Sequence, residues 1–311
     1  MKKIIFKGVK ALTFENNKFK VIVLPELGGK IASFYSKDYN FELLYQNQSD
    51  YYKTPEKYST FADYDTSGFD DCYPNIDKSD VVYGNKLIYY PDHGDIWFGN
   101  FDYHWIEGKL KLSYTSELLP YIYEKTLFLD DSGLNLEYQI KNTGKYTIDG
   151  FYTVHCLMNC EDDMKIIFPD NVQQVLNVCD SNVLGKKGTI HSYPKTKDLN
   201  GTDYYLNKVA GEKANKCEKY YAVESINQGK CGAYYPSIDA YFVLEYDSIK
   251  LPYLGLWINE SGFKNNYNCA LEPSNGFYDS LDTAKTNNKY YSLQPNETFS
   301  FTLKMNINKT Y

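Results

Sequence analysis

The side chains best suited to proton transfer in this chain are an imidazole and a carboxylate that lie far apart in the sequence. His155 ends an expected extended run over 147–155, and Glu272 closes the apolar run 267–272 just before Pro273. Proline disfavours helix at the preceding residue, so Glu272 is expected at a strand end, on a face with residues 268 and 270. An imidazole and a carboxylate that meet in one cleft can act as general acid and base. Taken locally, a buried structural histidine and an exposed strand-end glutamate are the commoner interpretations.

A second candidate segment is 91–97, which places one histidine between two carboxylates. His93 is flanked by Asp92 and Asp95, with Trp97 two residues further on. These groups offer hydrogen bonds to hydroxyls and an apolar face for stacking, which is the chemistry of a recognition site. The alternative is a loop histidine that Asp92 or Asp95 holds in place. The segment alone does not decide between the two.

The remaining histidines and the cysteines do not indicate a metal site. His104 is expected on a strand surface, and His191 is expected to be solvated within the polar region 177–219. The seven cysteines form no CxxC pair, and they are expected to be reduced thiols. The sequence contains no GxSxG, Walker A or HExxH motif. We therefore expect neither a metal nor a cofactor.

The elements that must position these groups follow a period of two. Apolar and polar residues alternate over 110–114, 134–140 and 299–305, which is typical of half-buried strands, and 130–133 is expected to form a hairpin turn. Helical patterning is limited to a few short candidates, and strands do not alternate with helices. The predicted fold is all-β, a large antiparallel β-sandwich. No linker or repeat interrupts it, so residues 1–311 are expected to form a single domain, with 177–219 as a surface excursion.

Composition narrows the classes of partner. The chain has 311 residues, 43% of them hydrophobic, and a net charge of -7, which argues against nucleic acid or an anionic membrane as a partner. It contains no arginine, so an anion site would depend on its 33 lysines or on backbone N–H groups. Lys7 and Lys10 interrupt the apolar N-terminal stretch, and no run is long enough to span a membrane. The expected location is the cytoplasm.

Several segments, taken together and in chain order, resemble the aldose 1-epimerase (galactose mutarotase-like) family. They are 21–31, 68–74, 92–97, 151–155 and the pair 251–259 with 270–276. The resemblance spans nearly the whole chain. The family's fold is a large β-sandwich, which agrees with the period-two pattern.

The resemblance implies an isomerase that interconverts the α and β anomers of a free hexose without cofactor or metal. Glu272 matches the family's base, which takes the proton of the C1 hydroxyl. His155 matches the acid, which protonates the ring oxygen so that the ring opens and closes again. We expect these two groups on opposite edges of one pyranose. The expected partner is a monosaccharide, and the expected state is a monomer or weak homodimer.

The resemblance also implies residues that bind the sugar. His93 matches the family's second cleft histidine. Asp71 and Asp95 are expected to accept hydrogen bonds from sugar hydroxyls, and Trp97 or Trp257 to provide a stacking surface.

Two features of the family's cleft are not matched. Its arginine has no equivalent here, and its aspartate falls near 218–221, where Glu218 or Lys219 is the candidate. Three alternatives therefore stay open: a carbohydrate-binding protein without turnover, a hexose-6-phosphate epimerase, and a glycoside hydrolase in which Glu272 pairs with Asp71 or Asp95.

Overall fold

A large antiparallel sheet forms one layer of the protein. The computed structural model describes residues 1–64 and 67–311, and in these the sheet has 12 strands. In spatial order they are β1 (Lys2–Phe6), β2 (Val9–Glu15), β3 (Phe19–Leu24), β4 (Lys30–Ser36), β6 (Phe69–Cys72), β14 (Thr153–Asn159), β24 (Tyr267–Ser274), β23 (Tyr253–Glu260), β20 (Lys216–Ala222), β16 (Gln174–Asn177) and β17 (Ile190–Ser192), with β5 (Phe41–Glu42) beside β4.

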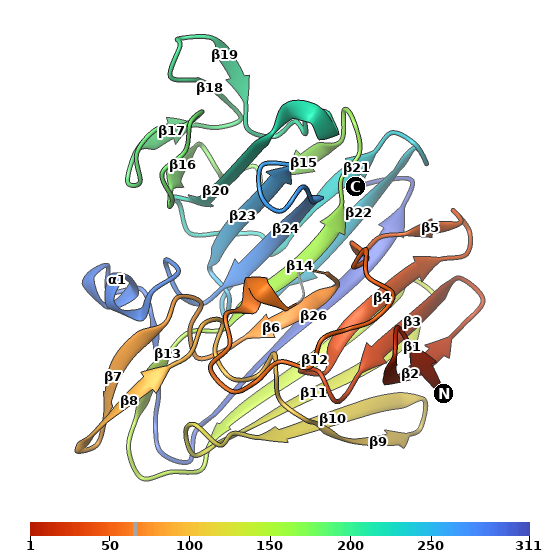
Figure 1. Ribbon diagram of the computed structural model, residues 1–311, viewed down its shortest axis with the longest axis vertical. Helices are drawn as coiled ribbons and strands as arrows, with labels where there is room; N and C mark the ends of the chain where they lie inside the picture. The colour runs from red at the N-terminus through yellow and green to blue at the C-terminus, as the bar shows by residue number, and fades with distance from the viewer. Residues whose placement is uncertain (65–66) are drawn as a thin grey trace.

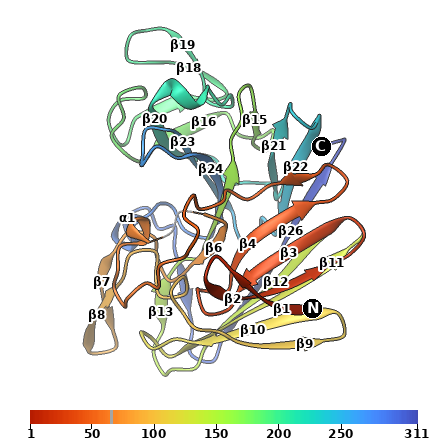
Figure 2. The same ribbon diagram turned by 45° about the vertical axis from the view of Figure 1, so that its right-hand side comes forward.

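A second antiparallel sheet of eight strands in the described chain packs against the first. Figures 1 and 2 show the strands of both layers running along a similar diagonal. Its strands, in spatial order, are β15 (Lys165–Ile167), β21 (Lys230–Tyr235), β22 (Ala240–Tyr246), β26 (Thr298–Asn308), β12 (Gly133–Asn142), β11 (Tyr121–Asp130), β10 (Lys109–Thr115) and β9 (Asp102–Ile106). The all-β sandwich predicted from the sequence is confirmed.

Short strand pairs and helical turns lie outside the two layers. The pairs are β7 (Ser79–Tyr83) with β8 (Lys86–Tyr90), β13 (Ile148–Gly150) with β25 (Tyr291–Leu293), and β18 (Lys195–Lys197) with β19 (Asp203–Tyr205). The helical elements are α1 (Leu281–Thr286) and the 3-10 turns η1 (Phe61–Asp63) and η2 (Glu212–Ala214). None of the helices described has the length and apolar composition that crossing a membrane demands.

The core lies between the two sheets and is rich in aromatic rings. The period-two strands bury alternate residues as predicted, for example in β10, β12 and β26. Tyr138 of β12 stacks on Phe301 of β26 with ring centroids 4.7 Å apart, and Tyr152 packs on the same phenylalanine. The 130–133 hairpin is confirmed, because Asp130 pairs with Gly133 where β11 turns into β12.

Two strand boundaries differ from the prediction, and both concern the candidate acid and base. β14 continues to Asn159, so His155 lies inside the strand and not at its end. β24 continues through Pro273 to Ser274, so Glu272 also lies inside. Pro273 lies where the pairing of β24 with β14 is interrupted between Leu271 and Ser274, while Leu254 of β23 still lies opposite it.

The polar region 177–219 carries several small elements. It includes β17, β18, β19 and η2 before it enters β20. The β18–β19 hairpin projects from the body in both views (Figures 1 and 2). His191 is buried here and is held at Nε2 by the carbonyl of Leu184, 2.9 Å away, so the expectation of a solvated side chain is wrong.

Candidate active site

The candidate site lies on the face of the large sheet that points away from the second sheet. Neighbouring residues in adjacent antiparallel strands stand side by side, and alternate residues of each strand share a face. Thr153 pairs with Ser274, and Cys156 with Leu271, which places His155 directly across from Glu272. Two sequence segments that are far apart are thereby brought into contact.

His155 and Glu272 form a hydrogen-bonded pair. His155 Nδ1 lies 2.9 Å from Glu272 Oε1, and the glutamate side chain is only 1% exposed. The expectation of opposite edges is therefore corrected, because the strands are neighbours and the two groups are adjacent. The anomeric hydroxyl and the ring oxygen of a pyranose are bonded to the same carbon, so adjacent groups can reach both.

The other oxygen of this glutamate is held more loosely. Glu272 Oε2 is buried and accepts no hydrogen bond from any described residue; its ion-pair partner Lys219 has Nζ 3.4 Å away. Gly255 is the cross-strand neighbour of Glu272 on β23, and a Cβ placed there would lie 3.2 Å from Oε2. Glycine at 255 therefore leaves space beside the carboxylate.

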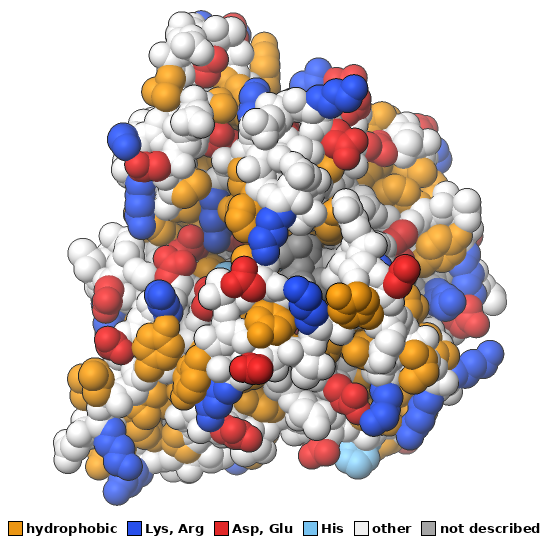
Figure 3. Space-filling model, in the orientation of Figure 1, with side chains coloured by type: hydrophobic (Ala, Val, Ile, Leu, Met, Phe, Trp, Pro, Cys, Tyr) orange, Lys and Arg blue, Asp and Glu red, His pale blue; other side chains and the backbone are white. Residues whose placement is uncertain are grey.

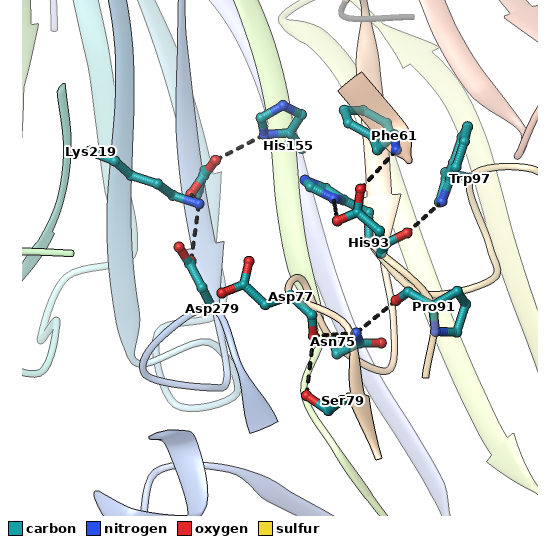
Figure 4. Close-up of polar contacts among 12 residues, drawn as sticks. Phe61, Asn75, Asp77, Ser79, Pro91, His93, Trp97, His155, Lys219 and Asp279 are labelled. Carbon is teal, nitrogen blue, oxygen red and sulfur yellow. Dashed lines mark hydrogen bonds and ion pairs between the residues drawn. The ribbon is translucent and has the colours of Figure 1, made fainter. Parts of the chain in front are cut away.

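Lys219 connects Glu272 to a second carboxylate. Its Nζ lies 3.0 Å from Asp279 Oδ1, and the same oxygen accepts a 2.9 Å hydrogen bond from Tyr221. Burial alone would lower the pKa of Lys219, but Asp279 and Glu272 outweigh it and hold this pKa above its usual value. Lys219 is thus a fixed cation in the site, and Figure 4 shows it directed at Asp279 and facing His155.

The protonation of Glu272 follows from this surrounding charge. Burial on its own would raise the pKa of the carboxyl, but Lys219, His155 and His93 together bring it below its usual value. The group is therefore ionised at neutral pH, as a general base requires.

His93 approaches the pair from a loop at the opposite wall. Its Nδ1 lies 2.8 Å from Asp92 Oδ1, and its ring stacks on Phe61 at a centroid distance of 4.3 Å. The centroids of His93 and His155 are 5.9 Å apart. Asp92 therefore anchors a histidine that also lines the cavity (Figure 4).

These groups surround a cavity of about 320 Å³. Trp257 forms part of its wall, as predicted, and contacts Phe263 edge-on at 5.7 Å. Among the described residues, the polar and charged side chains that line it are Asp77, His93, His155, Lys219, Asn259, Asn266, Asn268, Glu272 and Asp279.

Asp71 does not line this cavity, because its side chain lies in the core between the two sheets. Its Oδ2 lies 2.6 Å from Lys125 Nζ, and both side chains are fully buried. Its other oxygen accepts a hydrogen bond from Tyr152. On β6, residues 70 and 71 point to opposite faces of the sheet, and Asp71 points into the core between the two sheets. The expectation that Asp71 accepts sugar hydroxyls is corrected: it is part of a buried ion pair that joins β6 to β11.

Asp95 is also directed into the core. It accepts hydrogen bonds from Tyr114 at 3.1 Å, from Ser116 at 2.6 Å and from Tyr121. Burial raises the pKa of this carboxyl, and the three hydroxyls offset only part of the effect. Asp95 is buried and does not line the cavity, so it is not placed as a sugar ligand.

Trp97 lies behind the wall of the site and not on its surface. Its indole N–H donates to the carbonyl of Asp92 at 2.9 Å, and its ring meets Phe61 edge-on at 5.1 Å. It is buried. Of the two tryptophans proposed as stacking surfaces, Trp257 faces the cavity, whereas Trp97 supports Phe61.

Glu218 and Lys219 alternate along β20, and only the lysine faces this cavity. The sequence did not single out Asp77, Asp279 or Phe61, because they lie in loops or short turns without periodic pattern. Residues 178 and 179 border the cavity, so the beginning of the polar excursion is part of its wall. Among the described residues, no group of three or more His, Cys, Asp or Glu side chains could hold a metal ion.

The charged side chains outside the site are mixed in sign. Figure 3 shows lysines interspersed with aspartates and glutamates on one face of the molecule. Exposed pairs such as Lys10 with Glu26, 2.9 Å apart, are part of this pattern.

Comparison with known proteins identifies the fold. No family model matches the sequence, and no curated protein matches it with significance. Solved structures match over almost the whole chain. A galactose mutarotase-like protein from Lactobacillus casei ATCC 334 is 18% identical with a TM-score of 0.71, covering 96% of this chain and 100% of that one. One from Clostridium acetobutylicum is 16% identical with a TM-score of 0.64, covering 99% and 98%.

A third match is a candidate aldose 1-epimerase from Escherichia coli K12, which is 14% identical with a TM-score of 0.69 and covers 96% of this chain and 98% of that one. The protein therefore has the galactose mutarotase-like fold, as the sequence resemblance predicts. At these identities the comparisons establish the architecture, and the chemistry has to be argued from the site.

Proposed function

We propose that the protein is an aldose 1-epimerase-like isomerase that interconverts the α and β anomers of a free hexose. The observation that carries this proposal is the pairing of His155 with Glu272 at 2.9 Å on the floor of a cavity. The contact uses Nδ1 of the histidine and Oε1 of the glutamate, and it leaves Nε2 and Oε2 for a substrate.

The proposed reaction begins at the anomeric hydroxyl. Glu272 Oε2 takes the proton of the C1 hydroxyl, the C1–O1 bond becomes a carbonyl, and the C1–O5 bond breaks with its electron pair on O5. His155, protonated at both nitrogens, keeps Nδ1–H on Glu272 and gives its Nε2 proton to O5. The product is the open-chain aldehyde, neutral and still bound.

Ring closure reverses the proton transfers. After rotation about C1–C2, O5 attacks the other face of C1, His155 takes the O5 proton back, and Glu272 returns its proton to O1. The 2.9 Å contact of His155 Nδ1 with the buried Glu272 carboxylate supports this assignment, since opposite charges at this distance stabilise each other.

The charge of the cavity favours an uncharged sugar over a phosphorylated one. Lys219 is the one lysine among the described lining residues, and it is paired with Glu272 and Asp279. A phosphate would meet these carboxylates without a free cation to bind it. The glycoside hydrolase alternative loses the two carboxylates that were named as partners of Glu272, because Asp71 and Asp95 lie in the core.

The test is the rate of α/β exchange, followed by polarimetry or NMR with D-glucose, D-galactose and glucose 6-phosphate. The wild type should accelerate exchange of a free hexose, and Glu272→Gln should slow it by about 10²–10⁴-fold. Glu218→Gln is the matched control, because this buried glutamate on β20 does not line the cavity.

Two outcomes would contradict the proposal. Absence of exchange above buffer for all common aldoses would overturn it. Sugar binding by calorimetry that persists in Glu272→Gln, without exchange in the wild type, would instead support a carbohydrate-binding protein.

A further inference from the structure

Asn268 is a buried amide on the cavity floor whose side-chain oxygen accepts no hydrogen bond. It lines the cavity, is 1% exposed, and its Oδ1 has no donor among the described residues. A buried acceptor without a partner destabilises the folded protein, and native proteins rarely leave one unless something else satisfies it. Because Asn268 lines the cavity, a ligand is the expected source of the missing donor.

The neighbouring asparagines cannot supply this donor. Asn159 and Asn259 pair with Asn268 from the strands on either side. The Asn159 amide donates to the carbonyl of Glu42 at 2.9 Å, and the Asn259 amide donates to the carbonyl of Phe263 at 2.8 Å. Their N–H groups are directed at backbone carbonyls, so neither asparagine satisfies the buried Oδ1 of Asn268, a residue that lines the cavity.

Asn268 and Glu272 stand on the same face of β24, four residues apart. At the rise of an extended strand this separates them by roughly 13 Å. Ala270 lies between them with a small side chain, and Trp257 pairs with it from β23. With a hydrogen bond of about 2.8 Å at each end, roughly 7 Å remains, which is of the order of the distance across one hexose from its C1 oxygen to a distal hydroxyl.

We propose that Asn268 is a substrate-positioning residue that accepts a hydrogen bond from the hydroxyl at C4 or C6 of a hexose whose C1 lies at Glu272. This inference rests on the proposed function for the orientation of the sugar. It adds a contact to a distal hydroxyl, and through this contact the site would distinguish one hexose from another. The distal hydroxyl does not change charge during ring opening, so the contact contributes to binding and not to the chemical step.

The experiment compares sugars that lack single hydroxyls. Binding of D-glucose, 2-deoxy-, 4-deoxy- and 6-deoxy-D-glucose is measured by calorimetry for the wild type, Asn268→Ala and Asn268→Asp. The wild type should bind either the 4-deoxy or the 6-deoxy sugar about fivefold more weakly than glucose. Asn268→Ala should bind glucose and that deoxy sugar equally. The isosteric Asn268→Asp keeps the acceptor and should retain the contrast, that is, the difference in affinity between glucose and the deoxy sugar.

Three controls separate this role from a structural one. The difference in affinity between glucose and 2-deoxyglucose should be the same in all three proteins, because the C2 hydroxyl adjoins C1 and lies far from Asn268. Asn306→Ala changes a buried asparagine of β26 outside the cavity lining and should keep every contrast. In exchange kinetics, Asn268→Ala should raise KM about fivefold with kcat within about twofold of the wild type.

The outcomes distinguish the two proposals. If Asn268→Ala retains the full contrast, or if the wild type has none for the 4-deoxy and 6-deoxy sugars, the role of Asn268 is overturned while exchange activity stands. If the wild type shows the contrast but exchanges no sugar, only the proposed function fails. If the wild type binds no hexose, both fail.

Discussion

His155 Nδ1 and Glu272 Oε1 are 2.9 Å apart, although 117 positions of the chain separate the two residues. The contact leaves one nitrogen of the imidazole and one oxygen of the carboxylate for a ligand. Because these two atoms are side by side, they suit a substrate whose two reacting oxygens share one carbon. This relationship underlies the proposed anomer exchange and the first two predictions.

Replacing His155 with Gln should slow anomer exchange by about 10²–10⁴-fold, because the amide has no acidic proton for O5. The double variant with Glu272→Gln should be hardly slower than either single variant, since the two groups act as a unit. Exchange NMR at neutral pH measures both. Losses that multiply across the double variant would argue against a shared step.

Replacing Lys219 with Met should move the acidic limb of the pH profile of kcat/KM to higher pH. Activity needs ionised Glu272 and falls as pH drops through its pKa; Lys219 is the strongest of the charges that lower this pKa, so its removal raises it. Lys219→Arg keeps the charge and should leave the limb near its wild-type position. An acidic limb that stays in place in Lys219→Met would contradict the assignment of Glu272 as the base.

The ion pair of Lys125 with Asp71 should be important for stability and not for binding. Lys125→Met leaves a fully buried carboxylate without its cation and should lower the free energy of unfolding by about 3–5 kcal/mol. Urea denaturation measures the loss. Lys186→Met removes the exposed partner of Asp180 and should leave the stability close to that of the wild type. Equal effects of the two variants would show that the buried pair has no special role.

Glu218 should make the protein less stable as pH rises. Burial, with a further contribution from Glu260, raises the pKa of Glu218 from 4.5 to about 7, although Ser181 opposes the shift. Between these values the folded state binds more protons than the unfolded state, so the free energy of unfolding falls with increasing pH.

The matching variant is Glu218→Gln, which cannot ionise. It should be more stable than the wild type at pH 8 by roughly 1–3 kcal/mol and nearly equal to it at pH 4.5. Denaturation curves at both pH values provide the measurement. A stability difference that is the same at both would mean that the ionisation of Glu218 is not its cause.

The fold class was predictable because it depends on local pattern. Alternating residues in 134–140 and 299–305 bury one side of a strand whatever its neighbours are. The candidate acid and base could also be named, since His155 and Glu272 stand in segments that resemble a known family in order and type. Trp257 and Lys219 were expected in the cleft on the same ground, and the structure places both there.

The sequence did not predict which way the carboxylates of β6 and of the loops point. Asp71 and Asp95 were named as sugar ligands, yet Lys125 and three hydroxyls hold them in the core. Asp279, which no pattern marks, reaches the cavity through its pairing with Lys219.

The reason lies in what each level of structure controls. Which residues of a strand share a side is a property of the local backbone, so the sequence alone determines it. Which side meets the second sheet and which borders a cavity depends on how strands from distant segments pair, as β14 does with β24. Only that pairing brings His155, Glu272 and Lys219 onto one face, and only the packing of the two sheets removes Asp71 from it.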